Sequence, residues 1–201
     1  KDLVNAVYEG ELDKNLSIKV REIPASCGNL FIKFSLKEQN MSQTDKIVCK
    51  KSDLMEDKKF LKDLAEAEEV WLVSSWRDWH LKFMKLSIKN LSQLTSAKIK
   101  IFGRKDFPNF EPKKYIGLNK LERANYEDTV NIEVYNFNKK LSLEVGNKIF
   151  IDIQRMVCGI EKPKCKMFDE NGKIKTWDGV HFTKSGAKWF GKKLKNYLNY
   201  N

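Results

Sequence analysis

Long hydrophobic runs are missing from this sequence of 201 residues. No stretch approaches the roughly 18 consecutive apolar residues of a membrane-spanning helix. The start, Lys1-Asp2-Leu3, carries none of the apolar region that marks a secretory signal peptide. Internal repeats and low-complexity tracts are also absent. Because the length suits one domain with a sizeable core, these absences favour a single globular domain spanning residues 1–201.

Acidic residues are fewer than basic residues. The sequence has 38 Lys and Arg against 27 Asp and Glu, a formal net charge of +11. Such a balance favours an anionic partner such as nucleic acid, anionic lipid or an acidic glycan. However, the lysines are scattered, and neither a zinc finger nor an RNP-like aromatic motif is present. We therefore expect a lysine-rich solvated surface and no nucleic-acid partner.

Cysteines are few and none form close pairs. Zinc sites use cysteines with about two to four intervening residues, a spacing that this sequence lacks, and we expect no metal site. An even number at loop-like positions suits two disulfides between sequence neighbours, Cys27 with Cys49 and Cys158 with Cys165. That pairing indicates an oxidising compartment such as the periplasm. The alternative is four free buried thiols in a cytosolic protein.

The order of apolar patterns predicts strands separated by helices. Predicted strands cover residues 16–23, 70–73 and 98–102, with another centred on 149–151; predicted helices cover 2–9, 54–69, 78–91 and 183–197, with a weak or mixed segment at 118–140. Residues 30–48, 107–114 and 158–175 are expected to be irregular. Alternation of this kind predicts an α/β protein with a mostly parallel sheet. Active sites in such folds gather at the carboxyl ends of the strands.

Two residues before the last predicted helix suggest acid–base chemistry. The sequence holds only two histidines, His80 and His181, and Asp178 lies three residues before His181. A tight turn at Gly179 lets the carboxylate accept a hydrogen bond from one imidazole nitrogen, which leaves the other to take a proton from a serine hydroxyl. Thr183 is placed to cap the following helix. Four residues alone also fit an incidental surface loop.

A longer stretch of sequence supports the functional interpretation. Asp-Gly-Val-His-Phe-Thr-x-x-Gly-Ala at residues 178–187 resembles the last sequence block of SGNH (GDSL-type) hydrolases and acyltransferases. The early and late cysteine pairs, with segments 71–76, 101–104 and 151–154, resemble in particular the SGNH domain fused to acyltransferase-3 membrane proteins, which O-acylate surface polysaccharides. The resemblance implies a three-layer α/β/α sandwich, no cofactor, and a catalytic triad containing Asp178 and His181.

The same resemblance implies partners and a location. The acceptor would be a cell-envelope glycan, and the acyl donor would come from a membrane acyltransferase domain or protein. The domain would be periplasmic or extracytoplasmic, tethered to the inner membrane through a fused domain. An esterase of the same fold, a non-catalytic glycan-binding domain, and a basic domain that binds nucleic acid or an anionic membrane remain the alternatives.

Two parts of the family pattern are absent from residues 1–201. The first strand and the nucleophilic serine block would precede Lys1, which already lies in the first predicted helix. We expect that serine upstream of residue 1, because loss of a central strand would leave backbone N–H and C=O groups of the neighbouring strands without hydrogen-bond partners. The alternative is a truncated, inactive domain. The Gly-x-Asn-Asp block is also missing. Candidates for the oxyanion site or substrate contact are Ser75, Trp76, Asn29 and Arg104.

Overall fold

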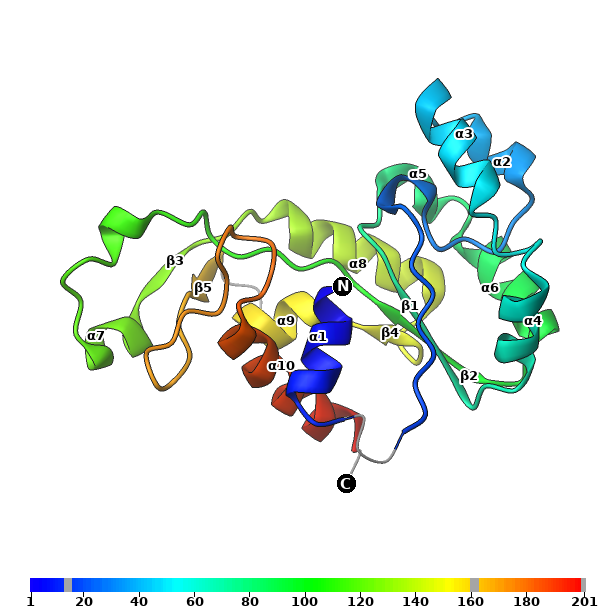
Figure 1. Cartoon of the computed structure of the whole chain (residues 1–201). Coiled ribbons are helices and arrows are strands. Elements are labelled where there is room, and N and C mark those ends of the chain that lie inside the picture. The colour runs from blue at the N-terminus through cyan, green and yellow to red at the C-terminus, as the bar shows by residue number, and fades with distance from the viewer. Residues whose placement is uncertain (13–15, 160–162, 200–201) are drawn as a thin grey trace. The chain divides into compact units, whose positions relative to one another are not determined.

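The chain forms two compact units in the computed structural model, which describes residues 1–12, 16–159 and 163–199. We call them the sheet unit (Lys19–Arg104 and Asn136–Asp152) and the terminal unit (Lys1–Ile18, Lys105–Tyr135 and Ile153–Asn201). Both units are therefore built from segments far apart in the sequence (Figure 1).

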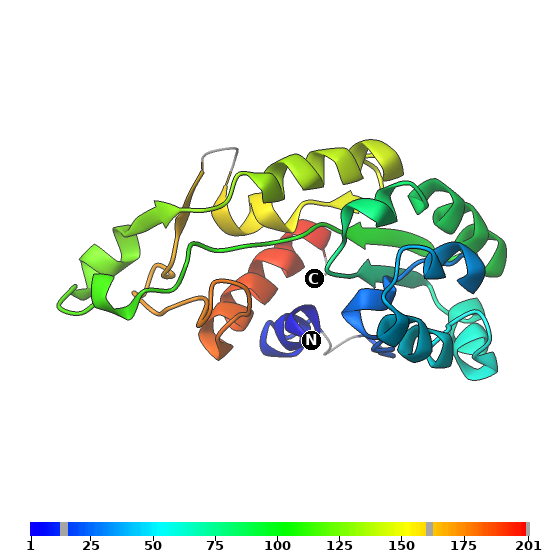
Figure 2. The same ribbon diagram turned by 90° about the horizontal axis from the view of Figure 1, so that it is seen from above.

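A three-stranded parallel sheet lies at the centre of the sheet unit. Its order is β1 (Glu69–Val73), β2 (Lys98–Phe102) and β4 (Phe150–Ile151). The two longer strands run side by side over their full length (Figures 1 and 2). Val73 is level with Phe102, and Phe102 with Ile151, so the three carboxyl ends share one edge. The expected α/β class with a parallel sheet is confirmed.

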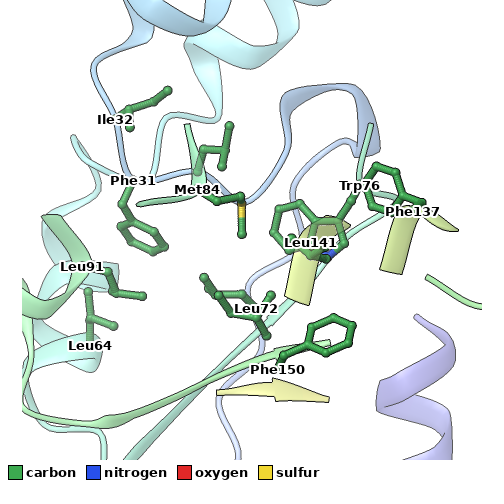
Figure 3. Packing of buried hydrophobic residues seen from close by; sticks show 12 residues of the cluster. Phe31, Ile32, Leu64, Leu72, Trp76, Met84, Leu91, Phe137, Leu141 and Phe150 are labelled. Atoms are coloured by element: carbon green, nitrogen blue, oxygen red, sulfur yellow. The ribbon is translucent and has the colours of Figure 1, made fainter. Parts of the chain in front are cut away.

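Helices of the sheet unit bury an apolar core against these strands. They are α2 (Phe34–Glu38), α3 (Gln43–Lys51), α4 (Lys58–Ala65), α5 (Asp78–Leu81), α6 (Met84–Leu94) and most of α8 (Glu133–Val145), with a 3₁₀ turn at Ala25–Cys27. Strand residues Leu72 and Phe150 meet Leu91 and Leu141 from the helices (Figure 3). Burial of such side chains stabilises a fold by about 1.5–3 kcal/mol each.

The terminal unit is organised around the first and last helices. It contains α1 (Asp2–Glu9), α7 (Lys120–Asn125), α9 (Ile153–Cys158), α10 (Lys184–Leu198), a 3₁₀ turn at Pro112–Lys114, and an antiparallel pair of β3 (Glu127–Thr129) and β5 (Lys164–Lys166). Helix α1 packs along α10 (Figure 1). Glycines permit this contact, because a Cβ at Gly191 would lie 2.0 Å from the Ala6 carbonyl oxygen.

Both expected disulfides are confirmed. Cys27–Cys49 joins the turn at Ala25–Cys27 to α3 in the sheet unit, and Cys158–Cys165 joins α9 to β5 in the terminal unit. All four cysteines are thereby paired. Closing chain loops in this way stabilises a fold mainly by restricting the unfolded chain.

The predicted strand at residues 16–23 is wrong. Apolar and charged residues do alternate there, yet no described strand pairs with this segment. Val20 remains 40% exposed, and the charged positions make ion pairs, with Lys19 Nζ 2.7 Å from Asp63 Oδ1. Alternation predicts a half-buried strand only where a neighbouring strand accepts its backbone hydrogen bonds.

Three other predictions also change. Residues 30–48 are not irregular, because Ser42 Oγ accepts a hydrogen bond from Asp45 N and starts α3. The single helix expected over residues 78–91 divides into α5 and α6, and the N-cap of α5 is Arg77. Residues 158–175 include β5, whose partner strand the sequence pattern does not reveal.

Candidate active site

A tight loop of the terminal unit carries the Asp178-x-x-His181 motif. An antiparallel bridge between Thr176 and Phe182 closes the loop at its base. Thr176 Oγ1 accepts a hydrogen bond from Gly179 N at 3.0 Å and donates one to the His181 carbonyl oxygen at 2.8 Å. Gly179 has φ +84°, a left-handed conformation that glycine adopts without strain. The backbone therefore turns back on itself and places the two motif side chains together.

The carboxylate and the imidazole of this motif are directly hydrogen-bonded. Asp178 Oδ2 lies 2.6 Å from His181 Nδ1, while Oδ1 accepts the backbone amides of Val180 at 2.9 Å and His181 at 2.7 Å. Partial desolvation pushes the pKa of the Asp178 carboxyl upward, but these hydrogen bonds outweigh it and lower that pKa to about 2. The ionised carboxylate thus orients the imidazole ring.

The His181 ring can exchange protons with a ligand. Its side chain is 51% exposed, and Nδ1 is the nitrogen held by Asp178. Nε2 is therefore the nitrogen that can accept a proton from a hydroxyl and return it to a leaving group. The contact between Asp178 and His181 is the geometry that the base-and-orienter half of a triad requires, and membership in a triad stays a prediction.

Neighbouring segments of the terminal unit contact the loop through hydrogen bonds, an ion pair and a cation–ring contact. Phe107 N donates to the Gly179 carbonyl at 2.7 Å. Lys105 Nζ forms an ion pair with Asp2 at 2.7 Å, donates to the Val180 carbonyl, and lies 4.4 Å from the Phe182 ring centroid. These contacts tie the loop to α1 and to the segment after β2.

The predicted cap of the last helix is confirmed. Thr183 Oγ1 accepts the Gly186 amide at 3.0 Å and donates to the Ile174 carbonyl at 2.6 Å. Phe182 stacks on Phe190 of α10 with ring centroids 5.1 Å apart. The position of His181 is therefore fixed by the start of α10 as well as by the loop.

Trp177 is a site residue that the sequence analysis does not single out. Its ring is stacked on the His181 ring, with centroids 5.5 Å apart and planes 16° apart, and it remains 57% exposed. Tryptophan side chains are highly buried on average, so an exposure of this size is above the ordinary for this residue type. Its place directly before Asp178 is the only sequence signal that could have identified it.

We predict that Trp177→Ala lowers the kcat of any reaction in which His181 moves the proton by about 3–10-fold, because an aromatic stack contributes about 0.5–1.5 kcal/mol to the orientation of the ring. Trp177→Phe, which keeps a flat partner, should recover most of the loss. The measurement is steady-state kinetics on the purified full-length protein, with circular dichroism as the folding control. Equal losses in the two variants would contradict a stacking role.

The oxyanion candidates Asn29 and Ser75 lie in the sheet unit near the end of β1. Asn29 Nδ2 donates to the Val73 carbonyl at 2.5 Å, which joins the loop after Cys27 to the carboxyl edge of the sheet. Ser75 follows two residues later and is exposed. The structure thus brings these two segments together, and their role in binding an oxyanion stays a prediction.

Trp76 and His80 are core residues of the sheet unit. Trp76 is 1% exposed, and its Nε1 donates to the Phe102 carbonyl at 2.7 Å, which favours packing over the substrate contact considered for it. His80 is fully buried, and its Nδ1 accepts the Arg77 amide. Burial and, secondarily, the Arg77 guanidinium lower the pKa of His80 to about 4. His80 is therefore a neutral structural histidine at pH 7.

Arg104 follows β2 at the same edge of the sheet. Asn138 of α8 holds its backbone on both sides, with Oδ1 accepting the Arg104 amide and Nδ2 donating to its carbonyl, both at 2.8 Å. Nδ2 also lies 3.1 Å from Asp152 Oδ1. The Arg104 guanidinium lies 5.2 Å from the Phe137 ring centroid. Asn138, which the sequence analysis passes over, thus fixes this end of the sheet, and substrate contact by Arg104 stays a prediction.

Metal ligation has no candidate within residues 1–12, 16–159 and 163–199, where no three His, Cys, Asp or Glu side chains gather around a common point. The described helices also include none that is both long and apolar enough to cross a bilayer.

Comparison with known proteins gives one informative match. No protein-family profile matches the sequence, and no curated protein matches it either. Among solved structures, the chain is similar to the periplasmic domain of a lipopolysaccharide acetyltransferase from Salmonella ser. Paratyphi A, with a TM-score of 0.62 and 19% sequence identity over 98% of this chain and 78% of that one. The chain therefore has the fold of that acetyltransferase periplasmic domain.

Proposed function

We propose that this chain catalyses serine-dependent O-acetyl transfer to a cell-envelope polysaccharide. The observation that carries the proposal is the 2.6 Å contact between Asp178 Oδ2 and His181 Nδ1, with both Asp178 oxygens fixed by hydrogen bonds. A carboxylate that orients an imidazole in this way is the base-and-orienter half of a Ser-His-Asp triad. The fold shared with a lipopolysaccharide acetyltransferase domain supports acetyl groups and polysaccharide as the substrates.

The proposed mechanism has two half-reactions. A serine upstream of residue 1 attacks the carbonyl carbon of the acetyl donor while His181 Nε2 takes the serine proton and passes it to the departing group. A polysaccharide hydroxyl then attacks the acetyl-serine, His181 takes the hydroxyl proton, and that proton returns to the serine oxygen as the ester bond breaks. Asp178 keeps the ring in the productive tautomer and stabilises its cationic form.

The oxyanion formed in each half-reaction needs hydrogen-bond donors. We assign this role to backbone amides after the upstream serine. A part for Ser75 or Asn29 in holding the oxyanion stays a prediction. Residues at this edge are where ligands bind in open parallel sheets. The chemistry requires neither a metal ion nor an organic cofactor.

The proposed location is periplasmic or otherwise extracytoplasmic. Two disulfides support an oxidising compartment, and the structurally similar domain is itself described as periplasmic. A membrane acyltransferase domain or protein would supply the acetyl group and tether this chain to the inner membrane.

The proposal is tested by comparing the amount of acetyl group transferred to polysaccharide with the amount released as acetate by hydrolysis. Purified full-length protein is incubated with an acetyl ester donor, with and without de-O-acetylated cell-envelope polysaccharide, and polysaccharide acetyl and free acetate are both measured. We expect polysaccharide acetylation to exceed acetate release. Acetate release alone would identify an esterase, and tight glycan binding without either product would identify a non-catalytic binding domain; either result overturns the proposal.

A further inference from the structure

A polar cavity in the terminal unit adjoins the motif loop on the side of Asp178. Its volume is about 360 Å³, roughly the space of a dozen water molecules and within the range of small-ligand pockets. Three segments line it: Asp106–Asn109 before the 3₁₀ turn, Thr129 and Asn131 after β3, and Asp178–Val180. The cavity thus shares Asp178 with the acid–base pair.

Hydrogen-bonding groups of both kinds face this cavity. Asn131 Oδ1 accepts the Glu133 amide, so its Nδ2 is the group left to donate. Within the described part of the chain, no protein partner is assigned to the Asn109 amide or to the Thr129 hydroxyl, and both residues are exposed. Amide, hydroxyl and carboxylate groups together match the donor-and-acceptor pattern of neighbouring hydroxyls on a ring.

The backbone fixes the wall that Gly179 and Pro108 form. A Cβ at Gly179 would lie 3.1 Å from the Pro108 carbonyl oxygen, and Phe107 N donates to the Gly179 carbonyl. Val180 contributes an apolar side chain that is 48% exposed and lies beside these polar groups. A ligand with hydroxyls on its edges and C–H groups on its face fits such a lining.

The charge of the lining differs from that of the whole chain. The chain has a formal net charge of +11, yet the lining includes the Asp178 carboxylate and neither lysine nor arginine. Asp178 is ionised at neutral pH because the pKa of its carboxyl is lowered to about 2. Carboxylates form strong hydrogen bonds with hydroxyl donors and repel anions. The cavity therefore favours a neutral polyhydroxyl ring over an anionic one.

We infer that this cavity is the acceptor subsite for a neutral sugar ring of the polysaccharide. The inference rests on the proposed function and names its acceptor class. The hydroxyl that reacts is the one that extends from the bound sugar to His181 Nε2, the ring nitrogen that Asp178 does not hold. That hydroxyl oxygen bonds to the acetyl carbon, the carbon–oxygen bond to the serine breaks, and His181 moves the proton from the sugar oxygen to the serine oxygen.

Sugar binding by the purified full-length protein tests the inference without any turnover. The probes are the methyl glycosides of glucose, galactose, mannose and rhamnose, with methyl glucuronide as the anionic probe. Chemical shifts of the Gly179 and Val180 amides and of the Asn109 and Asn131 side-chain amides report binding. We expect at least one neutral probe to shift these signals at millimolar concentration, and the glucuronide to bind at least fivefold more weakly.

Matched variants separate the cavity from the rest of the surface. Asn109→Ala and Thr129→Val should each weaken binding of the neutral probe at least threefold, whereas Asn196→Ala on the exposed side of α10 should leave it unchanged. His181→Ala should retain binding. No shift with any neutral probe, equal binding by Asn109→Ala, or tighter binding of the glucuronide would overturn the inference. Acetyl transfer retained by His181→Ala would instead overturn the proposed function, so the two failures are distinguishable.

Discussion

We expect His181→Ala to lower the proposed acetyl transfer by the full-length protein about 10³–10⁴-fold and to leave the fold intact. The expected loss is this large because, in the proposed mechanism, the imidazole moves the proton in both half-reactions. The fold survives because the His181 side chain is 51% exposed and packs on one ring, that of Trp177. Steady-state kinetics gives the first quantity, and thermal unfolding by circular dichroism gives the second.

Asp178→Asn should approach the same loss, because an amide in place of the carboxylate favours the wrong imidazole tautomer. The double variant should fall no further than His181→Ala alone, since the two residues act as one unit. Losses that add fully in the double variant would show that the side chains act independently and would contradict the pairing seen at 2.6 Å.

Gly191→Ala produces the second large effect, on stability. The added Cβ would lie 2.0 Å from the Ala6 carbonyl oxygen and 2.7 Å from the Gly10 Cα, and both are backbone atoms that cannot move without shifting α1. Overpacking of this kind costs about 1–3 kcal/mol in the free energy of unfolding, and sometimes more. Urea denaturation measures the change.

Lys192→Ala, at the next and exposed position of α10, is the matched control. It should change the free energy of unfolding by less than about 0.5 kcal/mol, as surface substitutions usually do. If Gly191→Ala were as harmless as this control, the close contact between α1 and α10 would not exist as described.

Prediction of the fold from sequence succeeds where a segment carries its own signal. Residues 98–102 are a strand of apolar and charged residues closed by glycine, and residues 2–9 are a helix closed by glycine; both match the structure at both ends. It fails at residues 16–23, where alternation occurs but no neighbouring strand is present among the described residues. A strand is a property of two segments, and one segment cannot reveal its partner.

In the candidate site, too, contacts between residues close in sequence are predictable and contacts between distant residues are not. Asp178 and His181 lie three residues apart, so a local turn suffices to join them and the motif predicts their contact. Asn138 escapes prediction because its role depends on Arg104, 34 residues away in the sequence. The role of Trp177 is not predicted because the amino-acid sequence does not distinguish an exposed aromatic ring from a buried one.

The most direct test of the acid–base pair is the O-acetyl content of the cell-envelope polysaccharide in cells that carry either the native full-length protein or His181→Gln as the sole copy. Proton NMR of the extracted polysaccharide measures the acetyl groups, and immunoblotting confirms equal protein levels. We expect the acetyl signal of the native strain to disappear in the His181→Gln strain. An undiminished acetyl signal in that strain would contradict the assignment of Asp178 and His181 as the catalytic pair.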